Sequence, residues 1–248
     1  MPRTARTISQ SGYYHVLSRG TGKQIIFEDD EDHIFFLKIL DKYRKEESSD
    51  IIAYCLMDNH FHILVRSDNL DRLMQKTGTT YAVYYNKKYD RTGHLFQNRF
   101  KSVPVETESS LLNVVRYIHN NPVKAGICSV DQYRWSSWEA YFGKKSLVQT
   151  DIVLSILGGR DGFLLYSKLD DTDPAESCLL DVDHTGRLTD EKAHRIIREK
   201  LNLESGTKIQ SMSRQHRDMA LRILKNEHLS IRQIERLTGL SRGIIQRA

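Results

Sequence analysis

The chain has 248 residues, of which 39% are hydrophobic and 28% are charged, and its formal net charge is +5. This length suits one large domain or a domain with a smaller one beside it, and the charge weakly favours an acidic partner such as nucleic acid. Three cysteines without paired spacing imply neither a disulfide framework nor a zinc site, and no apolar run reaches membrane-spanning length. Because the first residues also lack the apolar core of a signal peptide, we expect a cytoplasmic protein without a membrane partner.

The first expected elements are a strand and a helix joined by a basic loop. Residues 13–19 have the pattern of a strand, and residues 30–46 show apolar residues at helical spacing after an acidic start. The two glycines of the loop would let its backbone approach a phosphate, and Arg19 and Lys23 would supply positive charge. An ordinary glycine turn is the alternative interpretation.

Residues 50–66 predict two core strands joined by a tight turn. His60 and His62 lie in the second strand, among apolar residues. Because side chains two positions apart share one face of a strand, the two imidazoles should lie side by side while Phe61 points the other way, into the core. Such a pair is the beginning of a metal site, and the alternative is two ordinary hydrogen-bonded histidines.

A helix that opens at Asn69 or Asp71 is expected to run to about Lys88, and a strand should follow within residues 90–103. Alternation in the last part of that segment would turn its polar side chains to one face and its aromatic side chains to the core. The polar face would either hold a phosphate backbone or meet solvent, and it consists of Gln97, Arg99 and Lys101.

The next helix is capped by Thr107 and carries Tyr117 and Asn121, which share a face because they are four residues apart. Pro122 disfavours helical geometry at Asn121, so this residue should lie at a frayed helix end. The resulting order is strand, helix, strand, strand, helix, strand, helix. It predicts an α+β protein with a ferredoxin-like β-α-β-β-α-β core and one added helix.

Tyr117 and the histidine pair suit phosphoryl transfer. A tyrosine hydroxyl has an ordinary pKa of about 10 and is a poor nucleophile. Attack on phosphorus therefore needs a cation that takes up the charge developing on the nonbridging oxygens. His60, His62 and Asn121 would bind a divalent ion while leaving positions open for a phosphate. His119 is a rival third ligand, but a regular helix points it away from Tyr117.

The charge changes sharply toward the C-terminus. Residues 166–190 hold two basic and seven acidic residues and are predicted to form a connector, whereas residues 217–248 hold seven basic and three acidic residues. In the basic part, Ser230 and Ser241 are placed as caps of successive helices, with Gly239 at the turn. This pattern predicts a helix-turn-helix, with a plain helical hairpin as the alternative. Its recognition helix would present Arg242, Gln246 and Arg247.

The separate motifs together resemble one family. The His-Phe-His segment at residues 60–62 is similar to the HUH motif (His, hydrophobic residue, His) of single-strand DNA transposases. Residues 117–126 resemble the tyrosine motif of REP-associated tyrosine transposases, relatives of the insertion-sequence transposases with one catalytic tyrosine. Residues 19–27 and 93–102 also resemble this family. The resemblance covers about residues 8–142, with four motifs in the family's order.

The resemblance implies Mg²⁺ or Mn²⁺ held by His60, His62 and Asn121, and Tyr117 as the nucleophile. It implies a covalent 5′-phosphotyrosine and release of a 3′-hydroxyl from single-stranded DNA hairpins. Related enzymes often use a glutamine as the third ligand, so Asn121 departs slightly from the pattern. The C-terminal helices resemble the helix-turn-helix of replication initiators, which many family members lack, and would bind flanking duplex DNA.

These observations divide the chain into three predicted parts. A catalytic domain covers residues 1–142, an extension with the acidic connector covers residues 143–204, and a DNA-binding domain covers residues 205–248. The predicted function is metal-dependent cleavage and strand transfer of DNA by a monomer or homodimer. The alternative is a non-catalytic DNA-binding regulator derived from a transposase.

Overall fold

The computed structural model describes residues 6–169, 190–203, 205–227 and 229–248. The chain forms two compact units, Met1–His184 and Thr185–Ala248, and each unit has its own hydrophobic core. No helix in these described ranges is long and apolar enough to cross a membrane.

The first unit is built on a four-stranded antiparallel sheet in the order β2-β3-β1-β4. This is the order of a ferredoxin-like core, so the predicted fold class is confirmed. In chain order, the elements are β1 (Tyr13–Arg19), α1 (Asp30–Glu46), β2 (Asp50–Met57), β3 (His60–Arg66), α2 (Leu70–Lys88), β4 (Lys101–Pro104) and α3 (Glu108–Lys124).

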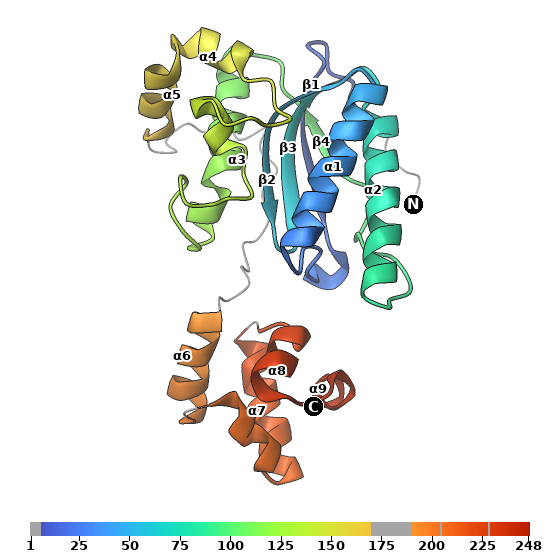
Figure 1. Ribbon diagram of the computed structural model, residues 1–248, viewed down its shortest axis with the longest axis vertical. Coiled ribbons are helices and arrows are strands. Elements are labelled where there is room, and N and C mark those ends of the chain that lie inside the picture. The colour runs from blue at the N-terminus through green and yellow to red at the C-terminus, as the bar shows by residue number, and fades with distance from the viewer. Residues whose placement is uncertain (1–5, 170–189, 204, 228) are drawn as a thin grey trace. The chain divides into compact units, whose positions relative to one another are not determined.

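Each face of the sheet has a separate core. Figure 1 shows α1 and α2 over one face, and α3 on the other, with α4 (Asp151–Leu157) and α5 (Arg160–Ser167) on the side of α3. Alternation along β3 separates the two cores, because Phe61 and Ile63 pack under α1 and α2 whereas Leu64 packs under α3. The histidines that flank Phe61 are therefore placed on the α3 face.

The turn between β2 and β3 is held by the segment that follows β1. The N–H groups of Ile26 and Phe27 donate to the carbonyl oxygen of Asp58, with N···O distances of 2.7 and 2.9 Å. Gly20 is required nearby, because a Cβ at this position would collide with the carbonyl oxygen of Gln24. Gly20 therefore allows the backbone of Gln24, in the same chain, to approach it closely.

The prediction of a strand through residues 95–100 is wrong. Residues 95–100 form a loop, and the strand expected within residues 90–103 begins only at Lys101, in β4, which pairs with β1. The loop is held by isolated hydrogen bonds and not by a strand ladder. One of them is the bond of 2.9 Å from the N–H of Gln97 to the carbonyl oxygen of Arg19. The polar side chains predicted to face a ligand are nevertheless all exposed: Gln97, Arg99 and Lys101.

The frayed helix end predicted at Asn121 is also wrong. α3 continues through Pro122 to Lys124, and Asn121 is fully buried inside it. The amide Nδ2 of Asn121 donates to the carbonyl oxygen of Tyr117 at 2.8 Å and lies 3.5 Å from that of Ile118. Because Pro122 has no N–H, it cannot donate the usual helical hydrogen bond to the carbonyl oxygen of Ile118. The side chain of Asn121 compensates for this missing bond in part.

The predicted extension is shared between the two units. Val153 of α4 and Phe163 of α5 are buried in the core under α3, and therefore belong to the first unit. Ala193 and Ile197 of α6 (Asp190–Leu201) are buried in the core of the second unit. Most of the predicted acidic connector, from residue 170 to residue 189, lies outside the described residues.

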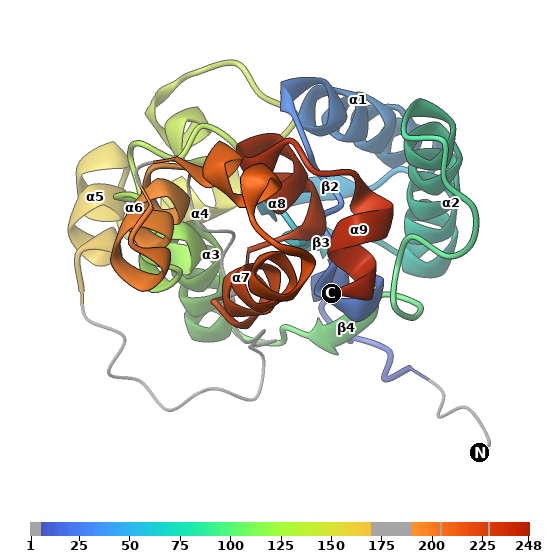
Figure 2. The ribbon, with the colours of Figure 1, turned by 90° about the horizontal axis from the view of Figure 1, so that it is seen from below.

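The second unit is all helical. The side chain of Ser230 accepts a hydrogen bond of 3.1 Å from the N–H of Gln233, and Gly239, with φ +71°, ends the helix that follows Ser230. These caps lie where the sequence predicts them. The elements after α6 are η4 (Gly206–Ser211), α7 (Arg214–Asn226), α8 (Ile231–Thr238) and α9 (Arg242–Arg247). Of these, α7, α8 and α9 pack side by side (Figure 2).

Candidate active site

The structure places His60 and His62 side by side on the α3 face of β3. Their ring centroids are 5.2 Å apart and their planes are nearly perpendicular, at 84°. Both side chains are buried, with 3% and 0% of their surface exposed. A buried pair of imidazoles so close together forms a polar site within an otherwise apolar strand.

Both rings are held through Nδ1. The Nδ1 atom of His60 lies 2.6 Å from Oδ1 of Asn59, and Nδ1 of His62 lies 2.9 Å from Nε2 of His15. Because an amide oxygen only accepts, His60 donates from Nδ1 and carries its lone pair on Nε2. The same tautomer of His62 would donate its Nδ1–H to His15. In both rings, Nε2 is then the nitrogen that a metal would meet.

His15 is a member of the site that sequence reasoning missed. It is fully buried on β1, and its ring centroid lies 5.2 Å from that of His62 and 5.6 Å from that of Tyr117. Alternation within residues 13–19, combined with the neighbouring places of β1 and β3 in a ferredoxin-like sheet, is the signal that would have found it.

Tyr117 reaches the histidines from α3. Its ring centroid lies 5.5 Å from that of His62, and its side chain is 1% exposed. The ammonium nitrogen of Lys124 lies 4.5 Å from the Tyr117 ring centroid, so a positive charge stands close to the phenol. The helix and the sheet thus bring a phenol, three imidazoles and a cation into one cluster.

Asn121 supplies an oxygen that fits a metal. Its Nδ2 is held by the backbone of α3, whereas its Oδ1 is buried without a hydrogen-bond partner in the described part of the chain. A buried amide oxygen in this state is costly, and a cation would satisfy it. No group of three or more His, Cys, Asp or Glu side chains among the described residues could hold a metal, so a site here needs Asn121 beside His60 and His62.

His119 lies outside this cluster. Its Nε2 is 2.8 Å from Oγ of Ser137, and its ring packs edge-on against Trp138 and Tyr141. Burial lowers the pKa of His119 to about 3, so the ring stays neutral within the core. The structure accordingly gives the rival ligand a packing role.

Among the predicted DNA-binding residues, Arg19 pairs with His60 in the register of β1 and β3, next to the candidate site. In the first unit, Nη2 of Arg19 is 3.5 Å from Oε1 of Gln97, while Lys23 is exposed on the loop after β1. In the second unit, Nε of Arg242 is 2.7 Å from Oε2 of Glu235. The DNA contacts of these residues, of Arg99 and Lys101, and of the exposed Gln246 and Arg247 stay predictions.

A ferredoxin-like sheet that places paired histidines against a helical tyrosine is the architecture expected of the transposase class to which the motifs point. Residues 8–121 match the family model of IS200-like transposases. This match places the similarity to the IS200-like transposase family within the first unit.

Solved structures extend this comparison. A REP-associated tyrosine transposase bound to a REP hairpin shares the fold, with a TM-score of 0.53, 13% identity and coverage of 73% of this chain and 99% of that one. A candidate transposase from Deinococcus radiodurans R1 gives a TM-score of 0.34 and 15% identity over 48% of this chain and 97% of that one. No curated protein sequence matches the chain.

Proposed function

We propose that the chain cleaves and rejoins single-stranded DNA, with Tyr117 as the nucleophile. The observation that carries this proposal is the position of the Tyr117 ring, 5.5 Å from the ring of His62 in a buried polar cluster. A transposase must break a phosphodiester bond, and such a cluster combines a nucleophile with groups suited to stabilise phosphate charge. The hairpin in the similar solved structure supports single-stranded hairpin ends as the substrate.

His60, His62 and Asn121 would hold a divalent metal, Mg²⁺ or Mn²⁺. When bound, the ion would supply positive charge at the nonbridging phosphate oxygens. The two histidines would offer Nε2, and Asn121 would offer its buried Oδ1. His15 would act as a positioning residue, because its contact with Nδ1 fixes the orientation of the His62 ring.

The chemical step exchanges one phosphodiester for another. The phenol oxygen of Tyr117 attacks phosphorus, a P–O bond to tyrosine forms, and the bond to the 3′ oxygen breaks. The phenol proton passes to solvent, and the departing oxygen takes up a proton to become a 3′-hydroxyl. Lys124 would stabilise negative charge on the phenol oxygen. Attack by a 3′-hydroxyl on the phosphotyrosine would then rejoin a strand.

Metal-dependent cleavage of a labelled single-stranded hairpin, taken from the DNA that flanks the gene, tests this proposal. We expect a shortened labelled strand and a protein–DNA adduct with Mn²⁺ or Mg²⁺, and neither product in a chelator. The same oligonucleotide annealed to its complement is the control, because its strand is not accessible. Binding without cleavage under every metal condition would favour the non-catalytic regulator.

We also propose that the second unit binds duplex DNA next to the hairpin, through Arg242, Gln246 and Arg247. Removing residues 185–248 should leave cleavage of a short hairpin nearly intact, because the first unit keeps its own core. The truncated chain should bind a hairpin with a duplex arm more weakly, and with a shallower salt dependence, because phosphate contacts are lost.

Fluorescence anisotropy over a series of salt concentrations measures this difference, with a hairpin that lacks the duplex arm as the control. Equal binding of both substrates by both proteins at every salt concentration would contradict the DNA-binding role. The helices of the second unit would then serve packing or oligomerisation.

A further inference from the structure

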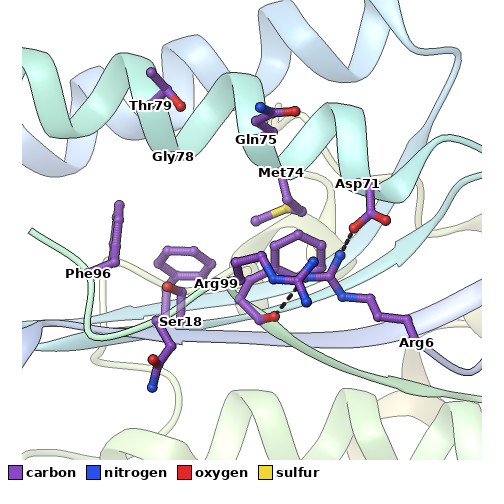
Figure 3. Close-up of a pocket in the computed structure, with 12 residues that line it drawn as sticks. Arg6, Ser18, Asp71, Met74, Gln75, Gly78, Thr79, Phe96 and Arg99 are labelled. Carbon is purple, nitrogen blue, oxygen red and sulfur yellow. Dashed lines mark hydrogen bonds and ion pairs between the residues drawn. The ribbon is translucent and has the colours of Figure 1, made fainter. Parts of the chain in front are cut away.

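A cavity of about 460 Å³ lies on the opposite face of the sheet from Tyr117, between α2, the strands β1 and β3, and the loop before β4 (Figure 3). This volume falls within the range of about 300–1,000 Å³ that is typical of small-molecule sites. Much of its wall consists of aromatic rings and one thioether, from Phe61, Phe96, Phe100 and Met74.

One end of the cavity carries more positive than negative charge. Arg6 forms an ion pair with Asp71, and its guanidinium carbon lies 3.6 Å from the ring centroid of Phe100. Arg99 lines the same region, and burial together with the Arg99 charge lowers the pKa of Arg6. Two guanidinium groups beside one carboxylate suit an anion with several acceptor oxygens, such as a phosphate.

The other end is suited to a flat ring. Phe96 stands at the end of the cavity away from Asp71 (Figure 3), and its ring lies edge-on to that of Phe61, with centroids 6.1 Å apart. Gly78 of α2 keeps this region open, because it has no side chain and a Cβ there would lie 3.8 Å from Phe96. Gln75 is on the same helix wall and offers an amide for polar recognition.

We propose that the cavity binds one unpaired nucleotide of the DNA strand, with its base between Phe96 and Met74 and its phosphate at Arg6 and Arg99. This inference rests on the proposed function, which supplies the strand. An aromatic wall for stacking, with cations at its edge, is the combination that proteins use for single-stranded nucleic acid. A free phosphate would use only the arginines and leave the aromatic wall unoccupied.

The location of the cavity indicates what the nucleotide would do. Ser18 in the cavity wall pairs with Phe61 across β1 and β3, and Phe61 lies between the two histidines of the candidate active site. Because those histidines point to the other face of the sheet, a nucleotide in the cavity is separated from Tyr117. It would anchor the strand and raise its affinity, while the chemical step would depend on the other face.

The first experiment uses the full chain with ¹³C-labelled methionine methyl groups, which give five signals. The four deoxynucleoside monophosphates should shift the Met74 signal in a saturable way, and should leave Met219, which lies in the second unit, unchanged. Inorganic phosphate and the four nucleosides are the comparisons. An equal shift with phosphate alone, or no Met74 shift with any nucleotide, would overturn the proposal.

The second experiment fills the cavity. Gly78→Leu places a side chain between α2 and Phe96, whereas the matched control Gly78→Ala adds a methyl group in ordinary contact. Both substitutions raise helix propensity inside α2, so folding should be preserved. The binding measurement uses a hairpin that the unchanged chain cleaves. Gly78→Leu should lower the affinity for this hairpin by about tenfold, as expected for loss of base stacking, and Gly78→Ala should leave the affinity unchanged.

Charge variants separate the phosphate contact from general attraction. Arg99→Gln should also weaken hairpin binding, whereas Lys38→Gln, which removes an exposed charge from α1, should not. Lys38→Gln should also give the normal adduct yield at saturating DNA. Unchanged affinity of Gly78→Leu would overturn the cavity proposal alone. Absence of adduct with the unchanged chain would instead contradict the proposed function. The Met74 signal would still show whether the cavity binds a nucleotide.

Discussion

Replacing Tyr117 by phenylalanine should abolish the covalent protein–DNA adduct while folding and hairpin binding stay close to normal. The substitution removes only the hydroxyl oxygen, which is the proposed nucleophile. The buried ring would remain in α3, where it contacts His15 and His62. Loss of the adduct without loss of binding therefore separates a chemical role from a structural one.

Denaturing electrophoresis with labelled hairpin measures the adduct, and mass spectrometry of the digested product locates the linked residue. Tyr84→Phe is the matched control, because Tyr84 is a partly buried tyrosine of α2 that packs in the other core. An adduct linked to Tyr84 or Tyr85, or a normal adduct yield from Tyr117→Phe, would refute the assignment of the nucleophile.

Replacing His62 by alanine should remove cleavage and weaken Mn²⁺ binding more than DNA binding. This residue is central to the cluster, since its ring lies next to those of His15, His60 and Tyr117. His60→Ala should act in the same direction. Because imidazole is a better ligand for Mn²⁺ than for Mg²⁺, the unchanged chain should bind Mn²⁺ more tightly, and both histidine variants should reduce that preference.

His15→Ala should have a graded effect, which distinguishes a positioning residue from a ligand. Loss of such an outer contact typically costs about 10–100-fold in metal affinity, so excess Mn²⁺ should restore cleavage to His15→Ala but not to His62→Ala. Titration of Mn²⁺ followed by both metal binding and adduct yield measures the two effects. His216→Ala, at an exposed histidine of α7, is the control. Full activity of His62→Ala, or of the unchanged chain in a chelator, would contradict the metal site.

The parts of the site that follow from local patterns could be predicted. Alternation along one strand is enough to pair His60 with His62, and helical spacing is enough to relate Tyr117 to Asn121. The contact of His15 with His62 joins residues 47 positions apart, and it exists only because β1 and β3 are neighbours in the sheet. A local pattern carries no information on that distant pairing.

The two errors in the fold have different origins. The alternation before β4 resembles that of a strand. The segment is instead a loop, which forms isolated backbone hydrogen bonds with the segment around Arg19 and buries Leu95 in the core. Pro122 is expected to end a helix, yet the Asn121 side chain donates within α3 and the helix continues. Contacts distant in sequence therefore decide the conformation of the loop, whereas a side-chain bond between neighbouring turns accompanies the continued helix.

The placement of Phe61 between His60 and His62 has a consequence for how such chains can diverge. Neighbouring positions of β3 face different layers of the protein, so substitutions around the cavity leave the histidine face of the sheet in place. If the cavity selects a nucleotide, descendants of one ancestor can acquire new target DNA through changes in α2 and the loop before β4. The cleavage chemistry is then inherited intact while target preference drifts from one lineage to the next.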